Sequence, residues 1–380
     1  MQRTVSWDAI VIGAGPSGST AAALLARAGK RVALVEKSEF PRRKVCGEYI
    51  SATTWPILAE LGVADRLAAR AGPPVTRVGL FARDVSVEAP MPAALAVAAW
   101  GRAVGREILD PALLDAARRA GVHVIQPATV DTVHRDDSGF IVSVDGGELR
   151  APRIIAAAGS WERGPFTQRA ERRASDLLGF KARFSNARLP EGLMPLVLFP
   201  GGYGGLVHTD AGEVSFSCCV RRDTLALARK RDGGSAGDAL IAHASAHCRA
   251  LRETLEGAWR HGAWLSAGPI RPGIRGGAKD GLLRVGNAAG EAHPLVAEGI
   301  SMAIQSAWLL AQCWDLGPNA YARAWHDTFA GRIRASSVFA ALTIPPGRSR
   351  ASVAVLERLP AVLTLGARWS GKARMPRAAA

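Results

Sequence analysis

The sequence predicts an α/β fold in which a Rossmann-like parallel sheet is joined to a second, mostly antiparallel sheet and followed by C-terminal helices. Near the N-terminus, the apolar run 8–12 leads into closely spaced glycines and then into a helical pattern. Much later, the apolar run 282–285 enters a second glycine-rich loop and a long helical segment. Between these regions, residues 176–275 show several strand patterns and only one or two helical ones. Two parallel-sheet regions therefore flank an antiparallel one.

The first glycine loop, Gly-Ala-Gly-Pro-Ser-Gly over residues 13–18, has the chemistry of a dinucleotide-binding turn. Glycines allow a tight turn and let the backbone approach a pyrophosphate at the N-terminus of the helix expected over 17–28. The strand expected over 31–36 ends at Glu36, whose carboxylate suits ribose hydroxyls and disfavours a 2′-phosphate. Strand, loop, helix, strand and acid in this order predict that the chain binds a dinucleotide.

The 380-residue chain is basic, with a formal net charge of +15. Its arginines are scattered without an aromatic-interleaved stripe, so no nucleic-acid partner is expected. Solvated faces explain the locally basic stretches 229–231 and 348–377 about as well as a partner does. The first apolar run enters the glycine loop directly and no later run is long enough to span a bilayer, so we expect a cytoplasmic protein without stable membrane insertion. The five cysteines lack CxxC spacing, which favours reduced thiols, and no metal site is expected.

The order of these patterns predicts two domains and a tail. We expect the dinucleotide-binding domain to be discontinuous and to comprise residues 1–81, 100–170 and 276–345. The substrate-binding sheet is expected to comprise 82–99 and 171–275, and residues 346–380 a helical tail with a disordered end. A strand is expected over 149–156, after a hairpin turn at 145–147. Alternation around Phe216 indicates a sheet with one exposed face, a suitable floor for a substrate pocket.

Four motifs, taken in order, resemble the superfamily of FAD-dependent group A monooxygenases, halogenases and geranylgeranyl reductases. They are the first glycine loop, the segment 101–114, the strand end 156–160 and the run 283–303. The segments 44–51 and 159–162 look most like the stand-alone oxidoreductases of bacterial natural-product pathways. The resemblance implies a Rossmann-like FAD-binding domain of the GR2 type.

The resemblance also implies which residues would hold the adenosine diphosphate half of FAD. Gly13, Gly15 and Gly18 would contact the pyrophosphate, and Glu36 the ribose. Arg106 would lie near the phosphates, because a guanidinium binds phosphate oxygens in a fork. The other cofactor contacts expected outside the late motif are Pro16, Ser17, Lys37, Arg43, Lys44, Cys46, Gly47 and Val130.

The late motif would hold the flavin half. Gly286 and Asn287 stand where the family usually has Gly-Asp, whose carboxylate bonds the ribityl chain, and asparagine can still hydrogen-bond there. The segment from Pro294 to Gly299, which opens a helix at Ile300, matches the segment beside the isoalloxazine ring. A helix N-terminus at that place stabilises negative charge on the reduced flavin.

The resemblance implies an FAD-dependent oxidoreductase, and the leading hypothesis is a monooxygenase. It would hydroxylate or epoxidise an aromatic or polyketide-like small molecule through a flavin C4a-hydroperoxide. A reductase or dehydrogenase of an isoprenoid or other unsaturated substrate is the alternative. A non-catalytic flavin-binding protein is disfavoured because both cofactor motifs accompany a separate sheet region. Halogenation is disfavoured because the Trp-x-Trp-x-Ile-Pro motif of tryptophan halogenases is absent.

NAD(P)H is the expected electron donor. The strand end carries Ala158-Gly159 where many hydroxylases have Asp-Gly, so direct reduction by NAD(P)H and reduction by a separate flavin reductase both stay open. A carrier protein is the other partner considered.

Four residues are candidates for activating or protonating the substrate, namely His293, His208, Tyr203 and Glu298. His293 ranks first, because it lies in the loop expected to border the flavin. Tyr203 belongs to the glycine-rich segment 201–205, which either turns a strand close to the flavin ring or forms an ordinary hairpin.

Overall fold

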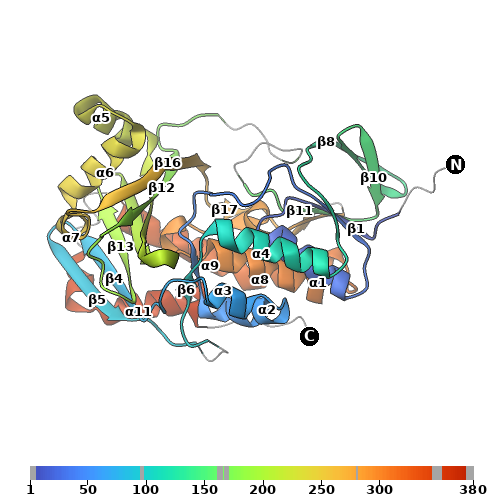
Figure 1. The fold of residues 1–380 in the computed structure, drawn as a ribbon, viewed down its shortest axis with the longest axis horizontal. Coiled ribbons are helices and arrows are strands. Elements are labelled where there is room, and N and C mark those ends of the chain that lie inside the picture. Colours follow the sequence, from blue (N-terminus) through green and yellow to red (C-terminus); the bar gives the residue numbers. More distant parts are fainter. Residues whose placement is uncertain are drawn as a thin grey trace.

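Two large sheets lie towards opposite ends of an elongated molecule in the computed structural model (Figure 1). The structure describes residues 6–94, 98–160, 166, 171–279, 281–344 and 353–373. None of the helices in these ranges is long and apolar enough to cross a membrane.

The first sheet has six strands and is parallel except at one edge. Its order is β18 (Ala278–Lys279), β19 (Leu282–Arg284), β11 (Ile154–Ala156), β1 (Ala9–Ile12), β2 (Val32–Val35) and β7 (His123–Ile125). Strand β18 pairs antiparallel with β19, whereas the other neighbours pair in parallel. All four residues of β1 are buried, as expected for a central parallel strand covered on both faces. The predicted Rossmann-like sheet is therefore confirmed.

Helices cover one face of this sheet and a small sheet covers the other. Val11 points towards the helices, whereas Ile10 and Ile12 pack against Phe140 and Val142 of the small sheet. The helices around this part are α1 (Pro16–Arg27), α2 (Trp55–Glu60), α3 (Ala64–Ala68), α4 (Arg106–Arg119), α8 (Gly299–Gln312) and α9 (Pro318–Thr343). The small sheet is antiparallel and consists of β10 (Gly147–Ala151), β9 (Gly139–Val144) and β8 (Val130–Asp136).

The single strand predicted over 149–156 is wrong, because the structure has two strands there. Strand β10 pairs with β9 in the small sheet, and β11 pairs with β1 in the parallel sheet. Pro152 lies between them and has no N–H to donate to a ladder. The chain therefore crosses from one sheet to the other at this proline.

The second large sheet has seven strands. Its order is β16 (Trp259–Ile270), β12 (Leu177–Ser185), β15 (Val214–Arg221), β14 (Gly202–His208), β13 (Leu193–Phe199), β4 (Arg77–Ala82) and β5 (Val85–Pro90). All neighbours are antiparallel except β13 and β4. The sequence analysis grouped β4 with the dinucleotide-binding domain, whereas β4 pairs with β13 and β5 in this sheet. Two short pairs complete the strands, namely β3 (Tyr49–Ile50) with β6 (Arg102–Ala103) and β17 (Gly273–Ile274) with β20 (Gly290–Glu291).

Both faces of the seven-stranded sheet are covered at its centre, which corrects the predicted exposed face. On β15, Phe216 packs against the helices, while Ser215 and Cys219 on the opposite face are also buried. Three helices rather than one or two belong to this region, namely α5 (Arg222–Asp232), α6 (Ala236–His247) and α7 (Arg249–Thr254). The alternation correctly separated the two faces, but the polar face is covered by other parts of the chain.

The C-terminal segment folds back over this sheet. It contains a helix over 353–358, α11 (Ala361–Ala367) and a further helical turn at Arg368–Lys372. Helix α11 contacts β4 and β5 and is drawn in red beside them in Figure 1. The predicted disordered end lies mostly over 374–380, outside the described residues.

A buried ion cluster joins the two parts of the molecule. Glu48, in the segment before β3, accepts a hydrogen bond from Arg183 Nη2 at 2.6 Å and forms an ion pair with Lys181 of β12. The side chains of Glu48 and Lys181 are fully buried. Burial alone would raise the pKa of Glu48, but the two cations together hold it below its ordinary value. Arg183 also reaches Glu107 of α4 at 2.7 Å, so the cluster ties β12 to the part of the molecule that contains the six-stranded sheet.

Replacing Lys181 by Met is expected to lower the free energy of unfolding by about 1–3 kcal/mol, because the buried Glu48 would keep Arg183 as its cationic partner but lose the ammonium group. Urea unfolding followed by circular dichroism measures the loss. The control is Lys30→Met, which removes a 2.8 Å ion pair to the exposed Asp315 and should cost about 0–1 kcal/mol. Equal losses in the two variants would contradict a structural role for the buried cluster.

Candidate functional site

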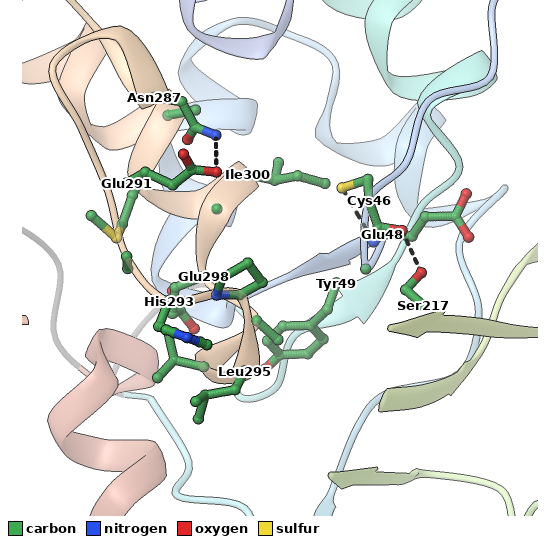
Figure 2. Close-up of a pocket in the computed structure, with 18 of the residues that line it drawn as sticks. Cys46, Glu48, Tyr49, Ser217, Asn287, Glu291, His293, Leu295, Glu298 and Ile300 are labelled. Carbon is green, nitrogen blue, oxygen red and sulfur yellow. Dashed lines mark hydrogen bonds between the residues drawn. The ribbon is translucent and has the colours of Figure 1, made fainter. Parts of the chain in front are cut away.

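A cavity of about 680 Å³ lies between the parallel sheet and the seven-stranded sheet. One end is bordered by the first glycine loop and by charged side chains, and the other by apolar side chains of β13, β14 and the C-terminal segment. The late glycine-rich segment and the start of α8 form the wall between these ends. Several of the lining residues from this central part are drawn in Figure 2.

The first glycine loop has room for an anion at one position only. Gly13 has φ +102°, and a Cβ there would lie 2.8 Å from the Ala157 carbonyl oxygen. A Cβ on Gly18 would lie 1.8 Å from the carbonyl oxygen of Gly13, so these two glycines are required for packing. At Gly15, by contrast, the nearest atom to a Cβ is Arg106 Nη2 at 3.7 Å. The backbone is therefore open to the cavity at the N-terminus of α1, where a phosphate group fits.

Basic side chains gather at the same end. Arg106, at the start of α4, is held by Asp110 through Nε–Oδ1 and Nη2–Oδ2 distances of 2.6 and 2.8 Å. Burial opposes its charge, but Asp110 outweighs burial and raises the pKa of Arg106. Lys44 has its pKa lowered to about 7 by burial and by the neighbouring charges of Arg42 and Arg106. Such crowding of cations fits the pyrophosphate of FAD, whose negative charge would relieve their repulsion.

Glu36 lies at the edge of this end, directly after β2. Its Oε2 accepts a hydrogen bond from Ala14 N at 2.8 Å, and its Oε1 accepts one from Ser38 N at 2.9 Å. Arg42 Nη1 lies 3.1 Å from Oε1. The carboxylate is thus oriented by the glycine loop itself, and its binding of ribose stays a prediction.

Gly286 packs tightly against Ser17 of α1, because a Cβ there would lie 2.7 Å from Ser17 Oγ. The next residue, Asn287, lines the cavity and donates a hydrogen bond from Nδ2 to Glu291 Oε1 at 3.1 Å (Figure 2). Ser160 Oγ donates to the other oxygen of Glu291 at 2.7 Å. Burial raises the pKa of Glu291. The sequence analysis did not select Glu291, although it belongs to the late motif that carries the resemblance.

The segment expected beside the flavin ring is a tight turn followed by α8. Pro294–Val296 forms a 3-10 turn, and Ala297 then adopts a left-handed conformation with φ +53°. Helix α8 starts at Gly299, one residue before the predicted start at Ile300. Pro294, Gly299 and Ile300 all line the cavity. The positive end of α8 is therefore directed at the cavity wall.

Tyr203 and His293 line the cavity side by side, with ring centroids 5.0 Å apart in a tilted contact. Burial raises the pKa of Tyr203 and lowers that of His293 to about 4, so both side chains are neutral at pH 7. Tyr203 Oη and His293 Nδ1 are buried and have no hydrogen-bond partner among the described residues, apart from the weak thiol of Cys219 near Tyr203. The pair can therefore hydrogen-bond an oxygen atom of a bound molecule.

Glu298, another of the four candidates, is engaged in an ion pair. Its Oε1 lies 2.8 Å from Lys372 Nζ, and both side chains are almost fully buried. Lys372 also donates to the carbonyl oxygen of Val296 at 2.6 Å. Lys372 belongs to the basic stretch 348–377, for which a solvated face and a partner were both open. Lys372 itself is buried and pairs with a carboxylate 74 positions earlier in the chain.

The structure does not bring every predicted residue to the cavity. His208 Nε2 pairs with the carbonyl oxygen of Leu189 at 2.8 Å, and His208 does not line the cavity. Arg43 is exposed and does not line it either. The remaining predicted residues that do line it are Pro16, Ser17, Lys37, Cys46, Gly47 and Val130. No group of three or more metal-binding side chains occurs in the part of the chain that the structure describes.

Comparisons with known proteins identify an FAD binding domain. Residues 6–173 match the family model described as an FAD binding domain. The chain is 31% identical to the menaquinone reductase of Mycolicibacterium smegmatis over 341 residues. This matched region covers 84% of this chain and 79% of that protein. The menaquinone reductase of Mycobacterium tuberculosis is 28% identical over 349 residues, covering 86% of this chain and 80% of that protein.

Solved structures share the fold at low sequence identity. A flavin-dependent brominase superposes with a TM-score of 0.76 at 18% identity, covering 98% of this chain and 94% of that one. A protein from Pseudomonas aeruginosa described as a probable FAD-dependent monooxygenase superposes with a TM-score of 0.66 at 17% identity, covering 97% of this chain and 99% of that one.

Replacing Gly15 by Leu is expected to abolish FAD binding without unfolding the protein. The backbone there has φ −67°, which any residue adopts, and the new side chain would occupy the open space beside Arg106. Flavin absorbance after reconstitution measures binding, and thermal unfolding of the apoprotein measures folding. Gly331→Leu, on an open helical surface of α9, is the control and should keep its flavin. Unchanged flavin content in the Gly15 variant would refute the assignment of this loop.

FAD binding is expected to take up protons near neutral pH. In the apoprotein the pKa of Lys44 is about 7, and a pyrophosphate beside it would raise that value. Affinity for FAD should therefore fall as pH rises above 7, because Lys44 must be protonated on binding. Calorimetry at about pH 7.5 in buffers of different ionisation enthalpy measures the uptake. Lys44→Met should remove it, whereas the exposed control Arg43→Met should not, and equal uptake in both variants would contradict the prediction.

Proposed function

The chain belongs to the superfamily of FAD-dependent group A monooxygenases, halogenases and geranylgeranyl reductases, and we propose that it reduces an unsaturated, apolar molecule of the isoprenoid quinone class. As an FAD-dependent oxidoreductase it holds its cofactor at the basic, glycine-lined end of the cavity. The proposal concerns the other end, where the substrate would lie. Its support comes from the walls of that end and from the relatives that match most of the chain.

The observation that carries the proposal is a mainly apolar chamber whose polar groups include the neutral pair Tyr203 and His293. Its walls are formed by Val78, Met194, Leu196, Leu206, Leu295, Phe339, Leu356 and Leu363. Tyr203 and His293 contribute hydrogen-bonding groups that carry no charge at pH 7. Such a chamber favours a hydrocarbon chain ending in a carbonyl or hydroxyl group over a charged metabolite. The matched relatives named menaquinone reductase are consistent with a substrate of this chemistry.

Reduced FAD, when bound, supplies two electrons as a hydride equivalent, and a proton completes the conversion of a carbon–carbon double bond to a single bond. The chain's own residues would position the substrate and exclude water. Tyr203 Oη would donate to a substrate oxygen, and the neighbouring His293 would hydrogen-bond the same group. Glu291, whose pKa is raised by burial, is a group that can retain a proton beside the cavity. NAD(P)H is proposed as the electron donor, with a separate flavin reductase as the other candidate.

The monooxygenase favoured from the sequence is the second candidate. The neutral Tyr203–His293 pair would hold a phenol as well as a quinone, and a mainly apolar chamber suits oxygen transfer too. Anaerobic turnover separates the two reactions, because reduction of a double bond needs no oxygen.

Reduced enzyme mixed anaerobically with a short-chain menaquinone is expected to lose its reduced-flavin spectrum and to give a product heavier by two hydrogen atoms. Mass spectrometry locates the added hydrogens, and in deuterated solvent at least one of them should be deuterium. The contrary result has two parts: the flavin is not oxidised anaerobically, and admission of ¹⁸O₂ then gives a product that contains one ¹⁸O atom. That result would establish the monooxygenase instead.

Tyr203→Phe is expected to lower kcat/KM about tenfold, because the variant loses one hydrogen bond to the substrate in a dry chamber. Its flavin content should stay unchanged, since Tyr203 lies on β14 away from the glycine loop. His208→Gln is the control and should keep wild-type kinetics, because His208 lies outside the cavity. If only the His208 variant lost activity, His208 and not Tyr203 would be the residue that contacts the substrate.

A further inference from the structure

Large apolar side chains are exposed along the C-terminal segment 353–373, called here the strap. Its outer row consists of Val355, Leu359, Val362, Leu365 and Trp369, which are between 38% and 76% exposed. The first two lie four positions apart and the last three at helical spacings of three and four, so each group lies on one helical face. Scattered single exposed apolar residues are ordinary, but a row of this kind marks an interaction site.

The strap is apolar on its inner side as well. Val353, Leu356 and Leu363 are buried in the core of the seven-stranded sheet. A surface helix normally pairs an apolar inner face with a polar outer face, and a helix that is apolar all round requires an apolar neighbour on both sides. The outer row is therefore apolar surface that no described part of the chain covers and that an apolar partner would bury.

The outer row lies at the mouth of the cavity. Val362, Leu365 and Trp369 belong to this row and also line the cavity. In Figure 1, α11 lies beside β4 and β5 at the edge of the molecule. A partner covering the row would therefore also cover the route into the substrate chamber.

The charge of the C-terminal region indicates which kind of partner covers the outer row. Residues 345–380 contain seven Lys or Arg residues and one acidic residue, Glu357. Arg358 and Arg368, next to members of the outer row, are exposed. An apolar row with an exposed tryptophan and flanking arginines is the pattern of an element that lies in the interface of an anionic bilayer. The net charge of +15 adds long-range attraction to such a surface.

The strap is held in place from within. Lys372 forms the buried ion pair with Glu298, and Thr53 Oγ1 donates to the carbonyl oxygen of Gly371 at 3.2 Å. Thr364 Oγ1 donates to the carbonyl oxygen of Pro90 at 2.7 Å. These contacts fix the strap against the cofactor-binding segment and β5, so the outer row is presented by a folded surface.

We propose that the strap is a peripheral membrane-binding element that sets the mouth of the cavity on an anionic lipid surface. The outer row enters the headgroup boundary, and the arginines contact lipid phosphates. The proposal goes beyond the redox function and does not rest on which reaction the enzyme performs. For a lipid-soluble substrate it provides a path from the bilayer into the chamber that avoids water. It concerns binding in the interface, and no part of the chain is required to cross the bilayer.

The test is co-sedimentation of the FAD-loaded full chain with vesicles of phosphatidylcholine, with and without phosphatidylglycerol. Wild type is expected to bind the anionic vesicles at least tenfold more strongly and to be released by salt. The variant Val355→Ser/Leu359→Glu alters two outer-row residues that do not line the cavity and should lose at least tenfold in vesicle affinity. Leu227→Glu is the matched control, since Leu227 is 67% exposed on α5, and it should bind like wild type.

Equal binding of wild type to both vesicle types, or equal binding of the outer-row and control variants, would overturn the proposal. Sedimentation velocity without vesicles tests for a second copy on the same row. A dimer that the outer-row variant abolishes would assign the row to self-association and also overturn membrane binding. Flavin absorbance of each variant and anaerobic turnover with detergent-dispersed substrate are measured separately, so failure of the membrane proposal and failure of the redox proposal give different results.

Discussion

The pairing of buried charge at Glu48 is the constraint on which the arrangement of the two sheets depends. A carboxylate removed from water must meet a cation, and the two that it meets, Lys181 and Arg183, lie on β12 of the seven-stranded sheet. Nearby, Ser217 Oγ of β15 donates to the carbonyl oxygen of Cys46 at 2.7 Å (Figure 2). Together these contacts attach the loop that follows the first βαβ unit to the substrate sheet. The cavity is therefore bounded by two parts whose relative position is set by charge and hydrogen bonds.

The two ends of the cavity differ in electrostatics, and under the proposed function this difference would separate cofactor from substrate. At the glycine-loop end, Lys44 and Arg106 keep positive charge near an open helix N-terminus. At the other end, burial keeps His293 and Tyr203 neutral. An anionic cofactor is favoured at the first end and an apolar substrate at the second. Positive charge is thus concentrated where phosphate would be bound, whereas the polar pair at the other end is neutral.

The C-terminal strap links the chamber to the outside of the molecule. Its inner side chains close the substrate end, and Lys372 reaches Glu298 at the start of α8. The strap therefore touches the substrate wall and the segment expected beside the flavin. A surface that faces only water would not carry such an apolar outer row. Under the membrane proposal, a lipid-soluble substrate would therefore reach the chamber past this segment.

The sequence by itself determined the elements whose conformation depends on residues close together in the chain. Alternation and glycine spacing predicted β1, the first loop, α1 and the start of α8, because backbone conformation follows from neighbouring residues. Only the tertiary structure decided which polar residues are buried. Lys372 meets a carboxylate 74 positions away, β4 joins a strand more than a hundred residues later, and Glu291 is buried beside Ser160. Partners distant in sequence decide burial, and burial sets the charge state of Lys44, Tyr203 and His293.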